Sequence, residues 1–250
     1  MNLNENKIPY DLEILSLAEE YQKWSLDAVK PFLGNRILEI GAGIGNMSRW
    51  LPVKELLVIT EADPFLVKRL RQVVSSSHGE NASVRVEEID LRSDWSKSLK
   101  NESIDTVVSF NVLEHVEDEI GALKTFADLL RASKSTKKKR IVTFVPAHKW
   151  AMGSIDKGYG HFRRYERSDF EKLRNEAAPD FDLKTRHFNV FGLPGWLLMS
   201  FISNKKGLDK TSILAFEKVC PLVRNIDDFL HTKFKLPFGQ SIISIMTLRE

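Results

Sequence analysis

Short apolar runs of strand length alternate with segments of helical spacing over the first 145 residues. Five runs of mainly aliphatic and β-branched residues predict strands, at residues 36–40, 56–60, 83–89, 104–110 and 140–145. Apolar residues three or four apart predict the helices between and before them, at residues 11–29, 64–74 and 117–130, with a further helix starting at 46–51. This alternation indicates an α/β fold with a doubly wound, mostly parallel sheet.

The rest of the chain follows a less regular pattern. Ser168 and Glu171 match a capping box, which predicts a helix starting near Asp169. Two further strands are predicted at residues 181–190 and 241–248. We therefore predict one domain with five consecutive parts: a helical segment (1–34), a core (35–145), a loop, helix and strand (146–188), a helical cap (189–239) and a last strand (240–250).

Composition narrows the possible functions. Lysine and arginine number 37 against 34 acidic residues, and a net charge of +3 is too small for the dense basic face of a nucleic-acid-binding protein. We therefore expect no nucleic-acid partner. A single cysteine, Cys220, excludes an internal disulfide. The polar start of the chain lacks the apolar core of a secretion signal, so we expect a cytoplasmic location.

A glycine-rich turn follows the first predicted strand. Gly41, Gly43 and Gly45 stand at every second position, where the absence of a Cβ lets the backbone turn sharply and approach a ligand. Dinucleotide-binding folds use the longer spacing G-x-G-x-x-G and bring a pyrophosphate to this point. Glu39, two residues before the first glycine, would oppose a pyrophosphate. It suits instead a cofactor that carries an ammonium group.

Acids and an amide follow the next three strands. Glu61 stands twenty residues after Gly41, at the edge of the second strand, where a carboxylate can accept hydrogen bonds from both hydroxyls of a ribose. Asp63 is the competing acid, but its position before Pro64 favours a helix N-cap. Asp90 follows the third strand, where it suits a polar contact to an adenine, and Asn111 follows the fourth.

These residues, taken in order, resemble the class I S-adenosylmethionine-dependent methyltransferase superfamily over residues 21–145. The resemblance implies S-adenosylmethionine as the cofactor and a Rossmann-like sheet of seven strands with the last one antiparallel. The residues implied to contact the cofactor are Glu39, Gly41, Gly43, Gly45, Glu61, Ala62, Asp90, Leu91, Asn111, Val112, Leu113 and His115. Tyr21 and Trp24, in the first helix, either close over the cofactor or pack in the core.

The sulfonium of this cofactor makes its methyl group electrophilic, so the protein must mainly align a nucleophile and help remove the proton of that nucleophile.

The long segment 145–165 is rich in Gly, His, Arg and aromatic residues, and long loops in compact domains are often functional. It resembles a bacterial subgroup with a Gly-His-x-Arg-Arg-Tyr signature, here residues 160–165, whose members often occur beside or fused to glycosyltransferases. His161 is our preferred base, with Asp156 and His148 as alternatives. His115 is interpreted first as site architecture.

The same segment offers substrate contacts. Arg163 and Arg164 could hold a phosphate or carboxylate, or one of them could pair with Glu166 or Asp169. The remaining residues that we expect at the substrate are Tyr159, Tyr165 and Trp196. The spacing of His148, Asp156 and His161 matches no standard metal-ligand pattern, so we predict no metal.

The apolar run 191–202, followed by Lys205 and Lys206, predicts a short helix beginning at Pro194. It either packs as a lid on the domain or on a second subunit, or contacts a membrane surface through residues 191–206.

The sequence does not specify an oligomeric state. We expect a methyltransferase acting on an oxygen or nitrogen of a small-molecule, glycan or lipid-linked acceptor. The alternatives are a nicotinamide-dependent oxidoreductase and a catalytically silent cofactor-binding protein.

Overall fold

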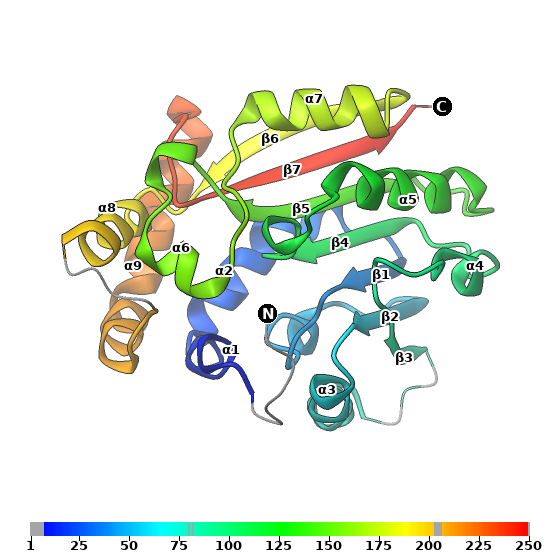
Figure 1. The fold of residues 1–250 in the computed structure, drawn as a ribbon, viewed down its shortest axis with the longest axis horizontal. Coiled ribbons are helices and arrows are strands. Elements are labelled where there is room, and N and C mark those ends of the chain that lie inside the picture. The colour runs from blue at the N-terminus through cyan, green and yellow to red at the C-terminus, as the bar shows by residue number, and fades with distance from the viewer. Residues whose placement is uncertain (1–7, 80, 82, 203–206, 250) are drawn as a thin grey trace.

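A seven-stranded sheet forms the centre of the computed structural model, which describes residues 8–249 except 80, 82 and 203–206 (Figure 1). The strands lie in the order β3-β2-β1-β4-β5-β7-β6, and β7 runs antiparallel to both of its neighbours. This confirms the predicted mostly parallel, Rossmann-like sheet with an antiparallel last strand. The strands are β1 (Arg36–Ile40), β2 (Leu56–Glu61), β3 (Val84–Glu88), β4 (Thr106–Phe110), β5 (Arg140–Pro146), β6 (Phe181–Phe188) and β7 (Ser241–Leu248).

The central strands are apolar on both faces because helices cover both faces. In β2, for example, the consecutive residues Leu57, Val58 and Ile59 are all fully buried. Strands buried on both sides have near-continuous aliphatic runs rather than alternating polar and apolar residues. The sequence patterns at these positions therefore predicted the strand bounds to within a few residues.

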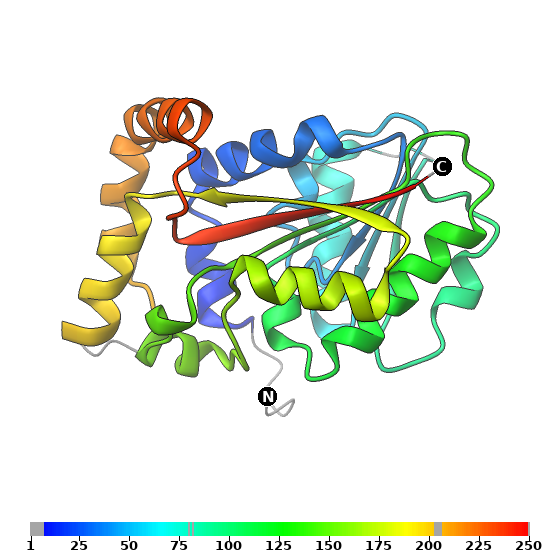
Figure 2. The same ribbon diagram turned by 90° about the horizontal axis from the view of Figure 1, so that it is seen from above.

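Two helical layers enclose the sheet (Figure 2). Phe126 of α5 and Phe170 of α7 belong to the apolar cluster on one face. Trp24 of α2, Leu70 of α3 and Cys220 of α9 belong to the cluster on the other face. The helices are α1 (Tyr10–Leu15), α2 (Glu19–Val29), α3 (Pro64–His78), α4 (Ser96–Leu99), α5 (Glu119–Ala132), α6 (Ser154–Tyr159), α7 (Arg167–Ala177), α8 (Gly192–Leu197) and α9 (Lys210–Phe234).

Three local predictions need correction. The helix expected at residues 11–29 is two helices, α1 and α2, because residues 16–18 leave the helical pattern between them. The helix expected from Asn46 is only a 3₁₀ turn, Ser48–Trp50, and Pro52 follows it closely, where a helix could not continue. The predicted capping box is wrong by two residues, since Glu166 is the N-cap of α7 and Asp169 completes the box.

The predicted long loop after β5 contains regular structure. A 3₁₀ turn covers Lys149–Ala151, and α6 begins three residues later. Asp156 explains the helix, because its carboxylate accepts the backbone N–H of Gly153 at 2.9 Å and so caps the first turn. Gly160 ends α6 in a left-handed conformation, with φ at +73°.

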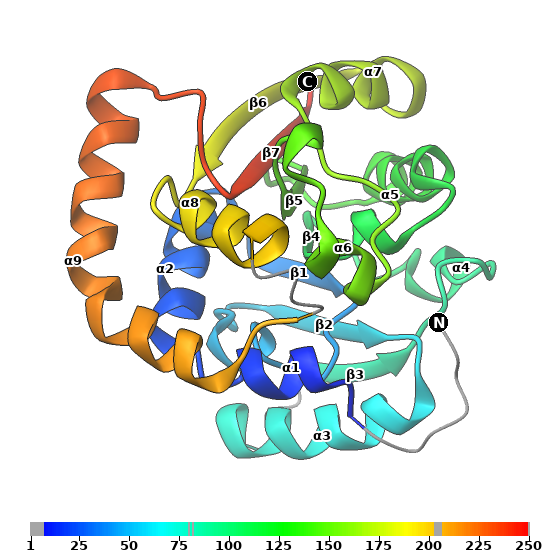
Figure 3. The same ribbon diagram turned by 60° about the vertical axis from the view of Figure 1, so that its left-hand side comes forward.

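The insertion between β6 and β7 is helical, as predicted. It contains α8, the π-helical turn Leu198–Ile202 and the long helix α9, whose N-cap Asp209 accepts the backbone N–H of Ser212. The predicted Lys205 and Lys206 lie outside the described residues. Figure 3 shows α1, α6, α8 and α9 gathered at the end of the sheet where the parallel strands finish. None of the described helices combines the length and hydropathy needed to cross a membrane.

Candidate active site

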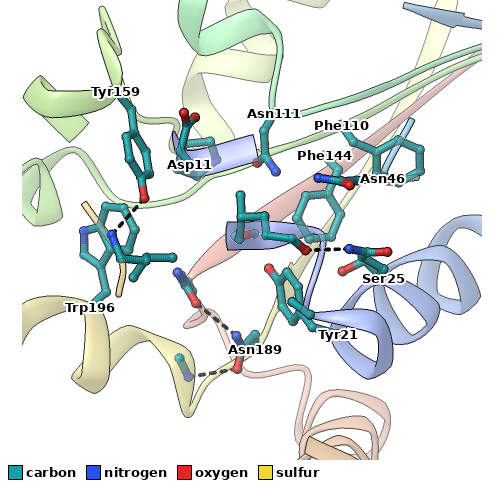
Figure 4. A pocket seen from close by; sticks show the side chains of 18 of the residues that line it. Asp11, Tyr21, Ser25, Asn46, Phe110, Asn111, Phe144, Tyr159, Asn189 and Trp196 are labelled. Carbon is teal, nitrogen blue, oxygen red and sulfur yellow. Dashed lines mark hydrogen bonds between the residues drawn. The ribbon is translucent and has the colours of Figure 1, made fainter. Parts of the chain in front are cut away.

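A cavity of about 500 Å³ lies at the carboxyl ends of the parallel strands, walled by residues of α1, α2, α8 and α9 (Figure 4). Open α/β sheets bind their ligands at this edge. The residues from our sequence predictions that line it are Tyr21, Glu39, Gly41, Gly43, Asn111, His115, Tyr159, His161, Arg164 and Trp196. The cavity thus joins residues predicted for the cofactor to residues predicted for the substrate.

The glycine turn after β1 fits its surroundings closely. Gly41 has φ at +68° and Gly43 at +58°, a region that side chains with a Cβ rarely adopt. A Cβ on Gly41 would lie 2.7 Å from a methyl carbon of Val112. Val112 therefore packs against the turn rather than lining the cavity, and the bare backbone at Gly41 and Gly43 forms the wall itself.

Glu39 is a buried acid that faces the cavity. Only 2% of its surface is exposed, and its Oε2 atom has no hydrogen-bond partner among the described residues. Burial raises the pKa of Glu39 to about 7, and the nearby carboxylate of Glu61 adds to the shift. A buried carboxylate oxygen without a partner is costly. A cation bound in the cavity would therefore satisfy it, as the ammonium group of S-adenosylmethionine would.

Glu61 is the last residue of β2, and its carboxylate contacts the glycine turn that follows β1. Its Oε2 accepts the backbone N–H of Gly43 at 2.7 Å, and its Oε1 accepts those of Ala62 and Asp63 at 2.8 and 3.0 Å. A carboxylate has about four lone-pair sites, so these contacts leave room for a ribose hydroxyl. Asp63 accepts the N–H of Phe65, which confirms it as the N-cap of α3.

The predicted adenine contacts lie outside the described cavity wall. Asp90 is held by Arg92, whose guanidinium makes contacts of 2.6–3.0 Å, and these hydrogen bonds lower the pKa of Asp90. Leu91 packs against the core beside it. Gly45, which was also predicted to contact the cofactor, is not among the residues that line the cavity and packs against Leu70.

The run after β4 divides between core and cavity. Asn111 has φ at +53°, a conformation that is uncommon for residues other than glycine. Its backbone N–H donates to the carbonyl oxygen of Phe144 at 2.7 Å. Leu113 is fully buried in the core. His115 lines the cavity and is partly open to solvent, and desolvation by its surroundings and the nearby His161 lower its pKa to about 4.

His161 is held by a buried acid. Its Nδ1 lies 2.8 Å from Oδ1 of Asp156, and the same oxygen accepts the Nε–H of Arg164 at 2.7 Å. Burial alone would raise the pKa of Asp156, but His161 and Arg164 hold it below its usual value. Arg164 also donates to the carbonyl of Ala147, and its guanidinium lies 4.5 Å from the ring of Trp196. Asp156 thus orients both a histidine and an arginine of the cavity wall.

The structure places three other predicted residues away from the cavity. His148 is buried and stacks on His187, with ring centroids 5.1 Å apart. Arg163 pairs with Glu119 at 3.2 Å, and the hydroxyl of Tyr165 donates to the same carboxylate. The alternative pairing of an arginine with Glu166 or Asp169 is wrong, because those acids contact His148 and Lys149.

The two aromatic residues weighed from the sequence, Tyr21 and Trp24 of α2, lie in different places. Tyr21 lines the cavity, whereas Trp24 packs in the core against Phe188 at 4.3 Å. Figure 4 shows that the remaining polar residues come from distant elements, which no local motif could identify; they include Asp11, Ser25, Asn46 and Asn189.

Glu114 stands between Leu113 and His115, two residues implied at the cofactor by the resemblance, but no role was predicted for Glu114 itself. It is fully buried, lines the cavity, and neither of its carboxylate oxygens has a hydrogen-bond partner among the described residues. Burial raises the pKa of Glu114 to about 8, while Arg164 opposes the shift. Acidic residues in the core of a protein are nearly always paired, so Glu114 marks a chemically unusual point of the wall.

Comparison with protein families finds a match to the family model described as a methyltransferase domain, over residues 15–177. Among curated proteins, the chain is 25% identical over 187 residues to a protein named ubiquinone biosynthesis O-methyltransferase from Cereibacter sphaeroides, covering 69% of this chain and 71% of that protein. A protein of the same name from Dinoroseobacter shibae is 26% identical over 196 residues, covering 74% and 75%.

Solved structures share the fold. A protein from Thermotoga maritima, described as a possible histamine N-methyltransferase, superposes with a TM-score of 0.57 at 17% identity, covering 94% of this chain and 92% of that one. A structure from Haloferax volcanii, of a putative methyltransferase in complex with the activator Trm112, gives a TM-score of 0.59 at 9% identity and covers 98% of each chain.

Proposed function

Because the chain belongs to the methyltransferase domain family, and is therefore an S-adenosylmethionine-dependent methyltransferase, we propose that it methylates a hydroxyl group of a small, largely apolar acceptor. The observation that supports the proposal is that Glu39, the glycine turn and His161 line the same cavity. Asp156 orients His161 there.

The cofactor end of the cavity is assigned from its unsatisfied groups. Glu39 would hold the ammonium group, and the bare backbone at Gly41 and Gly43 would allow close approach of the chain to the cofactor. Glu61 would accept a ribose hydroxyl through its remaining lone pairs. Asn111 would close the side nearest β4.

The acceptor end is largely apolar. The cap contributes aromatic and aliphatic side chains to the wall, namely Phe191, Trp196, Leu198, Met199, Leu208, Ile213 and Phe216. Such a wall favours a ring or an alkyl chain over a heavily hydrated molecule. The relatives named O-methyltransferases support oxygen as the accepting atom. A glycan or lipid-linked acceptor, and the link to glycosyltransferases implied by residues 160–165, remain predictions.

His161 has the geometry of a group that handles the acceptor's proton. With Nδ1 bonded to Asp156, Nε2 is the nitrogen available to the cavity. In the reaction, a bond forms between the acceptor oxygen and the methyl carbon as the bond from sulfur to that carbon breaks. The hydroxyl proton passes to Nε2 of His161, and alignment of the two reacting groups supplies most of the rate.

The proposal is tested with acceptors that differ only in their nucleophile. Purified protein is incubated with methyl-labelled cofactor and matched aromatic compounds that carry a hydroxyl, an amino or a carboxyl group on the same ring. We expect label in the hydroxyl compound first. A clear preference for the amine would overturn the assignment of the accepting atom, and a preference for sugars or sugar lipids would overturn the small apolar acceptor.

A further inference from the structure

Three potential metal ligands meet at the acceptor end of the cavity. Glu114, His115 and His161 each offer one ligand atom, and these atoms all lie within 4.8 Å of one another. The first two end the turn Leu113–His115 after β4, and the third follows α6. The backbone N–H of Phe162 donates to the carbonyl of Glu114 at 2.8 Å, which fixes the two segments together. This set differs from the one weighed from the sequence, which contained His148 and Asp156.

Glu114 supplies a buried carboxyl group without a hydrogen-bond partner in the described part of the chain, which a bound metal ion would hold in its ionised form. Both of its carboxylate oxygens are buried and lack hydrogen-bond partners among the described residues. Arg164 attracts the Glu114 carboxylate electrostatically, but no hydrogen bond between them is found among the described residues. Its Nε and Nη1 atoms donate to Asp156 and Ala147, and its Nη2 atom has no partner among those residues. Buried carboxylates are normally paired or coordinate a metal ion. The cavity therefore offers a carboxyl ligand to which the described residues make no hydrogen bond.

The histidines are arranged as ligands usually are. Asp156 accepts a hydrogen bond from Nδ1 of His161 and so leaves the lone pair of Nε2 free. Carboxylate groups hold metal-bound histidines in the same way, by fixing the tautomer and the orientation of the ring. The ring of His115 meets that of His161 edge to face, with centroids 4.7 Å apart and planes at 82°. Two nitrogens and one oxygen can thus point at one position.

We propose that Glu114, His115 and His161 bind a divalent transition-metal ion, of which Zn²⁺ and Mn²⁺ are the suitable probes. Two imidazoles and one carboxylate form a ligand set used by catalytic sites of such ions, which keep further positions open. Mg²⁺ prefers oxygen ligands and should bind more weakly.

The ion deepens the proposed function and rests on it. The acceptor oxygen would occupy an open position on the ion, which stabilises the oxyanion and so eases loss of the hydroxyl proton to solvent. The ion would then replace His161 as the group that contacts the acceptor oxygen, and His161 would hold the ion. The charge of the ion does not change in the reaction, and the methyl group moves from sulfur to oxygen as described above.

Calorimetry on chelator-treated protein without a polyhistidine tag tests the site directly. Zn²⁺ and Mn²⁺ should each bind at one site per chain, with Mg²⁺ weaker than both. Glu114→Gln and His115→Gln should each weaken binding by more than about tenfold. His187→Gln is the matched control, since it removes a histidine of the separate His148–His187 pair, and it should bind as the wild type does. A thermal melt verifies that each variant is folded.

Two results would overturn the ion site: no saturable binding to the wild type, or equal binding to both ligand variants and the wild type. Neither result bears on the accepting atom. A chelated enzyme that binds no ion but still methylates the hydroxyl compound would leave the proposed function intact. Conversely, one bound ion with transfer only to the amine would leave the ion site standing and overturn the hydroxyl acceptor.

Discussion

Nδ1 of His161 and Oδ1 of Asp156 lie 2.8 Å apart at the wall of the cavity, and Asp156 is fully buried behind the histidine. The acid cannot reach the cavity itself, so it acts by positioning the ring. The sequence suggested both residues as candidate bases, and the geometry favours different tasks for them. In the proposed function His161 contacts the acceptor, or an ion that holds it, and Asp156 positions the ring.

Replacement of His161 should separate turnover from cofactor binding. His161→Ala should lower kcat by about a hundredfold or more, because it removes the group that acts on the acceptor proton or holds the ion. The dissociation constant for S-adenosylmethionine should stay close to that of the wild type. Steady-state kinetics and calorimetry measure the two effects, with His187→Gln as the control. Normal turnover of His161→Ala would return Asp156 and His148 as the leading candidates.

Glu39 should make cofactor binding depend on pH. Burial raises the pKa of Glu39 to about 7 in the free protein, and only the ionised carboxylate attracts an ammonium group. Affinity for S-adenosylmethionine should therefore rise as the pH increases from about 6 to about 7.5, and fall again above about 8, where an α-amino group loses its proton. Calorimetry across this range should show the rise in the wild type and a weaker, flatter profile in Glu39→Gln. An unchanged rise in the variant would assign the titration to another group.

Gly43→Val should abolish cofactor binding. The residue has φ at +58°, which strains any β-branched side chain, and a Cβ there would already lie 3.2 Å from Leu12 in the wall of the cavity. The added methyl groups would extend into the space proposed for the cofactor. Calorimetry checks the loss, and a thermal melt checks that the fold survives. A variant that melts normally and binds with full affinity would contradict the proposed cofactor position.

Trp196 should set acceptor affinity rather than cofactor affinity. Its side chain comes from α8 and lines the cavity (Figure 4). The guanidinium of Arg164 lies over its ring, 4.5 Å from the centroid. Trp196→Ala would remove apolar wall and a cation–π contact worth about 0.5–2 kcal/mol. KM for the hydroxyl acceptor should rise, with the affinity for S-adenosylmethionine unchanged. The opposite pattern, with cofactor affinity lost and KM retained, would place the cofactor against the cap.

The core of the fold was accessible from the sequence because its signals are local. The burial of β1, β2, β4 and β5 on both faces produces continuous aliphatic runs, and Glu39, Gly41 and Gly43 lie directly beside such a run. The rest of the site depends on tertiary contacts. Asp156 orients His161 and Arg164 through α6, which the composition of that segment did not predict.

Some expectations stay predictions. Membrane contact through residues 191–206 is one, although Leu198 and Phe201 are exposed there and Trp196 is buried. The cytoplasmic location and the five-part division of the domain are others.

Glu114 was not predicted as a site residue because a sequence does not show whether an acid in a helical turn faces water or the core. Its burial without a partner appears only once the turn after β4 packs beneath the segment of Phe162.

The most direct test of the account is the fate of the methyl group. Wild-type protein is given cofactor with a ¹³C-labelled methyl group and the preferred hydroxyl acceptor, and the products are identified by NMR and mass spectrometry. The account predicts a ¹³C methyl ether and S-adenosylhomocysteine in equal amounts, with both much reduced in His161→Ala. Label on nitrogen or carbon, or full ether formation by His161→Ala, would contradict it.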